Sequence, residues 1–287
     1  MNTDITSRAM LARLSITQWS ARKHDKEITA EVCRTHQASA DAGRYNKLLV
    51  AAESIKAVQS AASAARLTHY KYTLPWRDDG ARILPSAAWF DYSKDMREAQ
   101  DHFWQAVNAL VGAYPALVQQ AQLRLNGMFR PEDYPPADQI RSRYTWDMSV
   151  DPIPAADDFR VQLSDAEVDR IRREIGARTE SAVSEAMRDA WQRLYDAVSH
   201  IVSRLSDSDA VFRDSLIGNV RDLCGLLPKL NLTGDANLEA ARQDVERRLA
   251  GLNPQDLRDD KRHRAEVADQ ARQIQSAMAA YMGGGVS

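Results

Sequence analysis

The sequence predicts a mainly α protein built on a long antiparallel helical hairpin, coiled-coil-like, with a small β cap and shorter flanking helices. Apolar side chains recur at helical spacing over two segments of about 40 residues, a strand-like segment joins them, and shorter periodic segments lie on both sides. We expect four regions: 1–85 (N-terminal helices and a β-hairpin), 86–205 (the long hairpin, with a β-containing tip at 129–163), 206–282 (C-terminal helices) and 283–287 (a flexible tail).

The first long helix is predicted to start after Ser86, a potential N-cap, and to end near Gly127. Pro115 lies inside it and is expected to kink it near Val111. Its apolar residues alternate in spacing between four and three, which is typical of a coiled-coil seam. The seam consists of Tyr92, Met96, Ala99, Phe103, Ala106, Leu110, Ala113 and Leu117.

The second long helix is predicted to begin at Ser164, which forms a capping box with Glu167, and to reach Leu205. Small residues occupy the centre of its apolar track, so a partner backbone can approach closely there. The track consists of Val168, Ile171, Ile175, Thr179, Ala182, Ala186, Ala190, Leu194, Val198, Ile201 and Leu205. Antiparallel packing of the two long helices buries both apolar sides; pairing between two protomers is the alternative.

The remaining elements follow from shorter patterns. Residues 143–150 and 159–163 have strand-like side chains and predict the β cap, and 11–19 is expected to be extended. Residues 72–76 and 81–85 flank Asp78-Asp79-Gly80, which predicts a β-hairpin. Further helices are expected at 25–37, 42–73, 208–227, 235–250 and 254–282.

Composition excludes several classes of protein. A chain of 287 residues that is 44% hydrophobic and 27% charged can bury a core, which excludes disordered and collagen-like chains. Two distant cysteines, Cys33 and Cys224, indicate reduced thiols, and no secretion signal or membrane span is visible. We therefore expect a soluble protein of the cytoplasm. Residues 1–82 are basic, with 13 Lys and Arg against 8 Asp and Glu.

Two residue groups invite a catalytic or metal-binding interpretation. Cys33 and His36 are spaced to share one helix face, but zinc needs more ligands and a nucleophile needs an orienting third group. Asp78 and Asp79 are paired carboxylates, but a turn favours Asp and Gly for backbone reasons alone. We therefore predict no catalytic residue, no metal and no cofactor.

Two further groups could contact a partner. Trp19 precedes the basic cluster Arg22, Lys23 and Lys26, an arrangement that can stack a base and hold a phosphate. The tryptophans near the predicted β-hairpin and the first long helix either pack in the core or form an exposed partner surface. They are Trp76, Trp89 and Trp104.

Several segments resemble an uncharacterised family of mainly α proteins, a domain of unknown function, carried by tailed phages and plasmids. These are 8–26, with Arg22-Lys23-His24-Asp25-Lys26, 41–49, 65–70, 73–76, 80–85 and 133–135. The resemblance covers roughly residues 8–205 and implies a phage protein in the cytoplasm of a bacterial host. Members are often encoded beside a MoxR-type AAA ATPase and a von Willebrand factor A-type protein, and the family has no catalytic residues to transfer.

The expected function is therefore that of a non-enzymatic adaptor or scaffold, partnering such an ATPase or associating with itself. The alternatives are a nucleic-acid-binding protein that uses the basic N-terminal region and an inhibitor of a host defence system.

Overall fold

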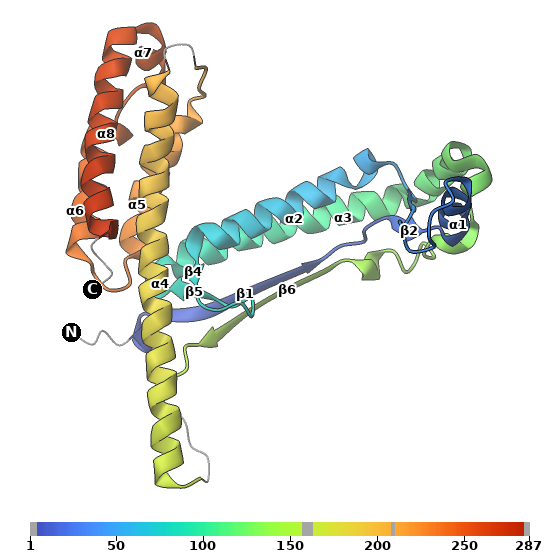
Figure 1. Ribbon diagram of the computed structural model, residues 1–287, viewed down its shortest axis with the longest axis horizontal. Helices are drawn as coiled ribbons and strands as arrows, with labels where there is room; N and C mark the ends of the chain where they lie inside the picture. Colours follow the sequence, from blue (N-terminus) through green and yellow to red (C-terminus); the bar gives the residue numbers. More distant parts are fainter. Residues whose placement is uncertain (1–4, 157–162, 208–209, 284–287) are drawn as a thin grey trace. The chain divides into compact units, whose positions relative to one another are not determined.

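The computed structural model describes residues 5–156, 163–207 and 210–283 (Figure 1). It is mainly helical, with a small antiparallel sheet. The described residues form two compact units. Unit 1 is drawn from 1–13, 70–92 and 149–287, and unit 2 from 14–69 and 93–148.

The larger sheet has the strand order β4-β5-β1-β6, with β1 at Ala9–Thr17, β4 at Leu74–Pro75, β5 at Arg82–Pro85 and β6 at Thr145–Pro152. The predicted β-hairpin is confirmed, because β4 and β5 pair antiparallel with Leu74 opposite Ile83. Its turn uses Gly80 at φ +84° and the Asp79 carboxylate, which accepts a bond of 3.0 Å from the Ala81 amide. Asp78-Asp79-Gly80 is therefore a turn.

The predicted β cap takes a different form. β6 joins the sheet beside β1, the extended segment expected at 11–19, because that strand offers an edge with backbone groups to pair. The second predicted strand, 159–163, falls almost wholly outside the described residues, as does most of the predicted tail.

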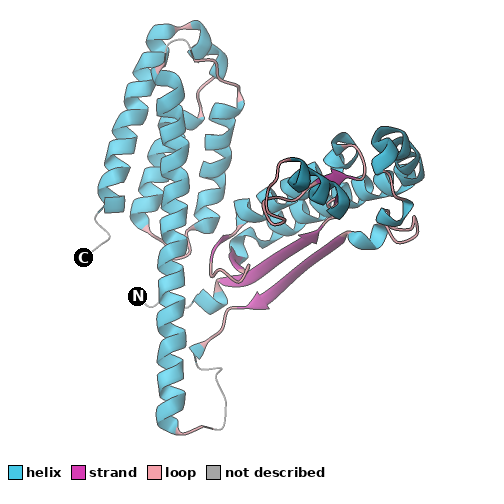
Figure 2. Ribbon diagram, turned by 45° about the vertical axis from the view of Figure 1, so that its right-hand side comes forward, coloured by secondary structure: helices cyan, strands magenta, loops and turns pink. Residues whose placement is uncertain are grey.

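Helices make up the rest of unit 1 (Figure 2). They are α4 (Asp165–Ser206), α5 (Ser215–Leu230), α6 (Ala236–Val245) with a π-helical turn at Glu246–Ala250, α7 (Pro254–Asp259) and α8 (Lys261–Gly283). The C-terminal half of α4 buries the predicted track from Ala182 to Leu205, and its partners are α8 and α5. The long hairpin is therefore not confirmed, because α4 already buries its apolar side within unit 1.

Two helices of unit 1 have other boundaries than predicted. The helix expected at 208–227 is α5, which begins at Ser215. Pro228 does not end α5, which continues to Leu230. Proline lacks the amide that would bond the carbonyl of Cys224 four residues earlier, and Arg242 donates to that oxygen instead, at 3.4 Å. The helix expected at 254–282 breaks at Asp260, whose carboxylate caps α8 through the amides of Arg262 and His263.

In unit 2, α2 (Ala52–Tyr72) and α3 (Trp89–Leu125) lie side by side (Figures 1 and 2). They share one core, in which Ile55, Val58 and Ala62 of α2 accompany Phe103, Val107 and Leu110 of α3. α2 begins ten residues later than expected, after the short strand β3 (Asn46–Leu48).

The buried side of α3 follows the predicted seam only in part, at Tyr92, Met96, Phe103 and Leu110. Tyr92, Phe103, Tyr114 and Leu125 are buried at intervals of eleven residues, whereas Ala113 is exposed. Eleven residues in three turns is close to the natural period of a straight α-helix, while a heptad repeat requires a left-handed supercoil. The coiled-coil seam is therefore not confirmed.

The expected N-cap of this helix was also wrong. Ser86 starts a 3₁₀ turn at Ser86–Ala88, and its hydroxyl donates to the Arg8 carbonyl at 2.8 Å.

Candidate functional site

The most distinctive surface of unit 2 is a small module of residues 22–48. It contains β2 (Arg22–His24), α1 (Lys26–Thr35) and β3, and β2 pairs antiparallel with β3 (Figure 1). Asp25 lies between β2 and α1 and caps the helix, accepting a bond of 3.1 Å from the Ile28 amide. The predicted helix at 25–37 is thus confirmed to within two residues.

A loop of residues 36–45 returns the chain from α1 to β3. It begins with a Schellman motif, in which Gln37 has a φ of +51° while the Ala38 amide donates to the Cys33 carbonyl at 2.8 Å. It ends where the Tyr45 amide donates to the Thr29 hydroxyl at 3.0 Å. Both ends of the loop are thus fastened to α1.

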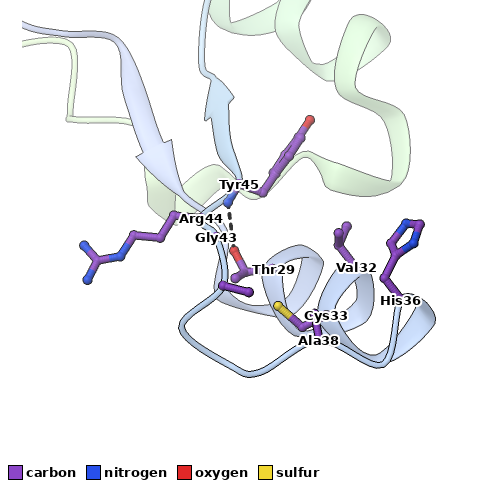
Figure 3. A pocket seen from close by; sticks show the side chains of 9 residues that line it. Thr29, Val32, Cys33, His36, Ala38, Gly43, Arg44 and Tyr45 are labelled. Atoms are coloured by element: carbon purple, nitrogen blue, oxygen red, sulfur yellow. Dashed lines mark hydrogen bonds between the residues drawn. The ribbon is translucent and has the colours of Figure 1, made fainter.

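An open hollow of about 320 Å³ lies between α1 and this loop (Figure 3). The side chains of Val32, on α1, and of His36, at the start of the loop, point toward the same space as the Tyr45 ring (Figure 3). Cys33 lies near Thr29 and Ala38 (Figure 3). Val32 and Tyr45 remain 48% and 38% exposed. The hollow therefore presents apolar side chains to solvent.

A second hollow of about 350 Å³ shares Thr29, Cys33 and Ala38 with the first, and we call the two together the α1 hollow. A smaller hollow of about 190 Å³ adjoins the second through His24 and Lys26, and its lining includes Asp25, Glu27 and Asp133. The lining of the α1 hollow consists of His24, Lys26, Thr29, Ala30, Val32, Cys33, Arg34, His36, Ala38, Ala40, Ala42, Gly43, Arg44 and Tyr45. Every ionisable side chain of Asp, Glu, Lys, Arg or His type in this lining is basic, so the hollow favours negative charge.

The acidic residues of the module lie outside this lining. Glu27 forms an ion pair with Arg130, and Asp41 accepts a bond of 2.6 Å from the Ser39 hydroxyl. That hydroxyl is the main cause that lowers the pKa of Asp41, so its carboxylate remains charged.

A buried ion cluster fixes the module to the turn at Pro131–Asp133. Lys47 Nζ lies 3.0 Å from Asp25 Oδ2 and 2.7 Å from Asp133 Oδ2, and it donates to the Met128 carbonyl at 2.8 Å. Burial lowers the pKa of Lys47, but hydrogen bonds to Asp133 and Asp25 more than reverse this, and the net shift is upward. The Lys47 hydrogen bond and the Ile28 amide hold the pKa of Asp25 below its ordinary value. Lys47 and Asp25 are therefore both charged at neutral pH.

The structure places the predicted basic cluster on this module, and Trp19 is partly buried against the core of unit 2. Arg22, Lys23 and Lys26 are exposed, and Lys26 lines the α1 hollow. Trp19 packs edge-on against Tyr114, with ring centroids 5.7 Å apart, beside the core of unit 2.

The other three tryptophans that were predicted as possible partner contacts each pack against a neighbouring side chain. In unit 1, Trp76 is buried with the Arg77 guanidinium 5.0 Å from its ring centroid, and Trp89 lies 6.4 Å from Tyr92. In unit 2, Trp104 lies between the Phe103 ring at 5.1 Å and the Arg141 guanidinium at 4.7 Å.

Sequence reasoning missed both the α1 hollow and the ion cluster. Cys33 and His36 do line one hollow, as their spacing suggested, but Val32 and Tyr45 had no signal beyond being apolar in a polar stretch. Asp133 lies 86 positions after Lys47, and only the fold brings the two together. The one available hint of the ion cluster was Lys47 itself, a lysine in a short strand of an otherwise exposed segment.

The described part of the chain has neither a cluster of metal ligands nor a helix that could span a membrane. In 5–156, 163–207 and 210–283, no three His, Cys, Asp or Glu side chains gather as a metal site would require. None of the helices in these ranges has the length and apolar character needed to cross a membrane. Comparisons of the chain with protein-family models, with curated proteins and with solved structures found no match.

Proposed function

We propose that the chain is a non-enzymatic adaptor that binds another protein through the α1 hollow. The observation that supports this proposal most directly is the exposure of Val32 and Tyr45 on either side of an open, largely apolar depression. Apolar and aromatic side chains that stay accessible around a concavity are typical of binding sites, because burying them on association is favourable.

The way the module is built also supports a binding role. The Schellman motif, the Thr29–Tyr45 bond and the Lys47 cluster hold the walls of the hollow in place before a partner arrives. A preformed site loses less conformational entropy on binding than a loop that must order itself. This is the arrangement expected of an adaptor that meets its partner through a stable surface.

The partner we propose is a MoxR-type AAA ATPase acting with a von Willebrand factor A-type protein, in the cytoplasm of a phage-infected bacterium. This choice rests on the resemblance of residues 8–205 to the phage and plasmid family. Self-association of the adaptor is an outcome that the same experiment detects.

The test is co-expression with the ATPase and the von Willebrand factor A-type protein of the same genome, followed by gel filtration with light scattering. We expect the wild type to co-elute with one of them, and Val32→Glu to weaken the complex at least tenfold. Leu123→Glu is the matched control, because Leu123 is also apolar and exposed in unit 2 but lies on α3. Absence of a complex with either protein, or equal binding by both variants, would refute the proposal.

Nucleic-acid binding is the second candidate, favoured by the exposed side chains of Arg22, Lys23 and Lys26 on one module. A gel shift with single-stranded and duplex DNA at about 50 and 200 mM salt tests it, because phosphate contacts weaken steeply over that range. No shift at the lower salt removes this candidate.

A further inference from the structure

We propose that the α1 hollow binds an acidic peptide segment that contributes one apolar side chain. The inference rests on the proposed function, in that the partner is a protein, and it specifies the chemistry of the segment that is bound. Three features of the hollow lead to it: its apolar walls, the sign of its charges and its size.

The apolar walls call for an apolar side chain. Val32, Ala38, Ala42 and the Tyr45 ring line one of the two parts of the hollow, which Figure 3 shows from close by. At about 320 Å³ and 350 Å³, its two parts are at the lower end of the range of about 300–1,000 Å³ for ligand sites. This is space for a side chain and its backbone rather than for a folded domain.

The charges call for carboxylates beside that side chain. Lys26, Arg34 and Arg44 line the hollow, together with His24 and His36, and no Asp or Glu does. Arg44 lines the hollow but its side chain extends away from Val32 and His36, so its guanidinium lies outside the part of the hollow that those two residues line (Figure 3). Complementary charge across an interface steers the encounter and selects against basic segments.

The same features favour a peptide over nucleic acid. Single strands bind to rows of exposed aromatic rings, on which successive bases stack. The α1 hollow has one such ring, Tyr45, and its hydroxyl donates to the Met128 sulfur at 3.8 Å. Trp19, the nearest tryptophan in sequence, packs against Tyr114. Methyl groups and cations form the rest of the site, which suits an aliphatic or aromatic side chain among carboxylates.

Fluorescence anisotropy on the full chain tests the inference with three labelled 12-residue peptides. The first carries a single Leu among Glu, Ser and Gly residues, the second replaces each Glu by Gln, and the third replaces the Leu by Ser. We expect the first to bind at least tenfold more tightly than the other two, and its affinity to fall as salt is raised.

Two charge-reversal variants show whether binding takes place at this site. The pair Lys26→Glu and Arg44→Glu reverses charge at the first residue of α1 and in the loop, where neither change interrupts a helix or strand. Lys56→Glu and Lys94→Glu change the net charge by the same amount on α2 and α3, outside the hollow. The first pair should lower the affinity for the acidic peptide at least tenfold, and the second pair should leave that affinity unchanged. Urea unfolding curves that match the wild type show that both variants are folded.

Each contrary outcome overturns a defined part of the inference. Equal affinity for the Glu and Gln peptides, or for the Leu and Ser peptides, refutes the proposed chemistry. Tighter binding of a 12-nucleotide oligo-dT, abolished by the first variant pair, assigns the site to nucleic acid. If no peptide binds while Val32→Glu still disrupts the ATPase complex, the inference fails and the adaptor function stands. If no peptide binds and Val32→Glu does not disrupt the ATPase complex, both the inference and the adaptor function fail.

Discussion

Lys47 Nζ lies 3.0 Å from Oδ2 of Asp25, and the two side chains are only 1% and 5% exposed. Asp133 completes the cluster from a different part of the chain, at 2.7 Å from the same nitrogen. A buried ion pair adds little net stability over apolar residues, but it makes the loss of one partner costly, because the remaining charge has lost its counter-ion. The cluster thus specifies one position for the module against the turn at 131–133.

Replacing Lys47 by Ala should therefore destabilise unit 2 by about 3–5 kcal/mol, because two buried carboxylates lose their cation. Hydrogen–deuterium exchange over residues 22–48 should show the loss of protection directly. Lys56→Ala, an exposed lysine on α2, should change stability by less than about 0.5 kcal/mol. The triple change Lys47→Met, Asp25→Asn and Asp133→Asn should recover part of the loss, and a triple variant as unstable as Lys47→Ala would contradict this explanation.

The cluster also sets a pH range for the module. The pKa of Asp25 is depressed below its ordinary 3.8, so its contribution is present above that pH and is lost as pH falls through the lower, folded value. The pKa of Lys47 is raised above 10.5, so its contribution is present below that pH and is lost as pH rises through the higher, folded value.

We therefore expect protection of residues 22–48 to be constant between about pH 5 and pH 9 and to fall below about pH 4. Exchange corrected for the intrinsic pH dependence of amide rates measures this on the acid side. Asp25→Asn should be less protected at neutral pH, and its difference from the wild type should shrink as pH falls below 4. A difference that stays constant down to pH 2 would show that Asp25 is not the titrating group.

The local elements could be predicted from the sequence because their causes are local. Gly80 and Asp79 make a turn wherever they stand between two apolar runs, and Asp25 caps the helix that follows it. The limits of the heptad argument are equally physical. Tyr92, Phe103, Tyr114 and Leu125 fit an eleven-residue period as well as the eight seam positions, which include Tyr92 and Phe103, fit a heptad. Only the packed neighbours decide between the two periods.

The partners of the long helices could not be predicted. The apolar side of a helix shows that it is buried, but it does not show which element covers it. The alanines of α4 allow several neighbours to approach, and α8, about 80 residues later in the chain, is the one found. The same holds for the candidate site. Of its basic residues, only Lys26 belonged to the predicted cluster. The hollow itself needs the loop of residues 36–45 folded back on α1, and the Lys47 cluster needs a turn from far along the chain.

Gln37 is the C′ residue of the Schellman motif, with a φ of +51°, and it should be more stable as glycine. A side chain in the left-handed region costs about 1 kcal/mol, and glycine avoids this steric cost. We expect Gln37→Gly to raise the free energy of unfolding by up to about 1 kcal/mol in urea titration. Gly80→Ala is the reverse change at a φ of +84° and should lower it by a similar amount. The free energy of unfolding should therefore change in opposite directions at the two sites. If Gln37→Gly is destabilising, the glutamine side chain stabilises the fold by more than its backbone strain costs.

Arg264 of α8 should be the most sensitive arginine in unit 1. It is 6% exposed and donates to four carbonyl oxygens around the C-terminus of α4, among them Arg204 at 2.9 Å and Ala210 at 3.0 Å. Its guanidinium also lies 5.1 Å from the Phe212 ring centroid. A helix end has carbonyls without partners in the helix, and each one buried unpaired costs about 1–3 kcal/mol.

Arg264→Met keeps the length of the side chain but leaves these carbonyls without their donor, so we expect a loss of about 3 kcal/mol in the free energy of unfolding. Arg264→Lys should recover less than half of it, because one ammonium cannot reach oxygens that a planar, forked guanidinium spans. Thermal and urea unfolding measure both. Arg262→Met is the control, since Arg262 lies two residues earlier with a side chain that is 90% exposed, and it should have little effect. A loss below about 1 kcal/mol for Arg264→Met would mean that water replaces the guanidinium at this helix end.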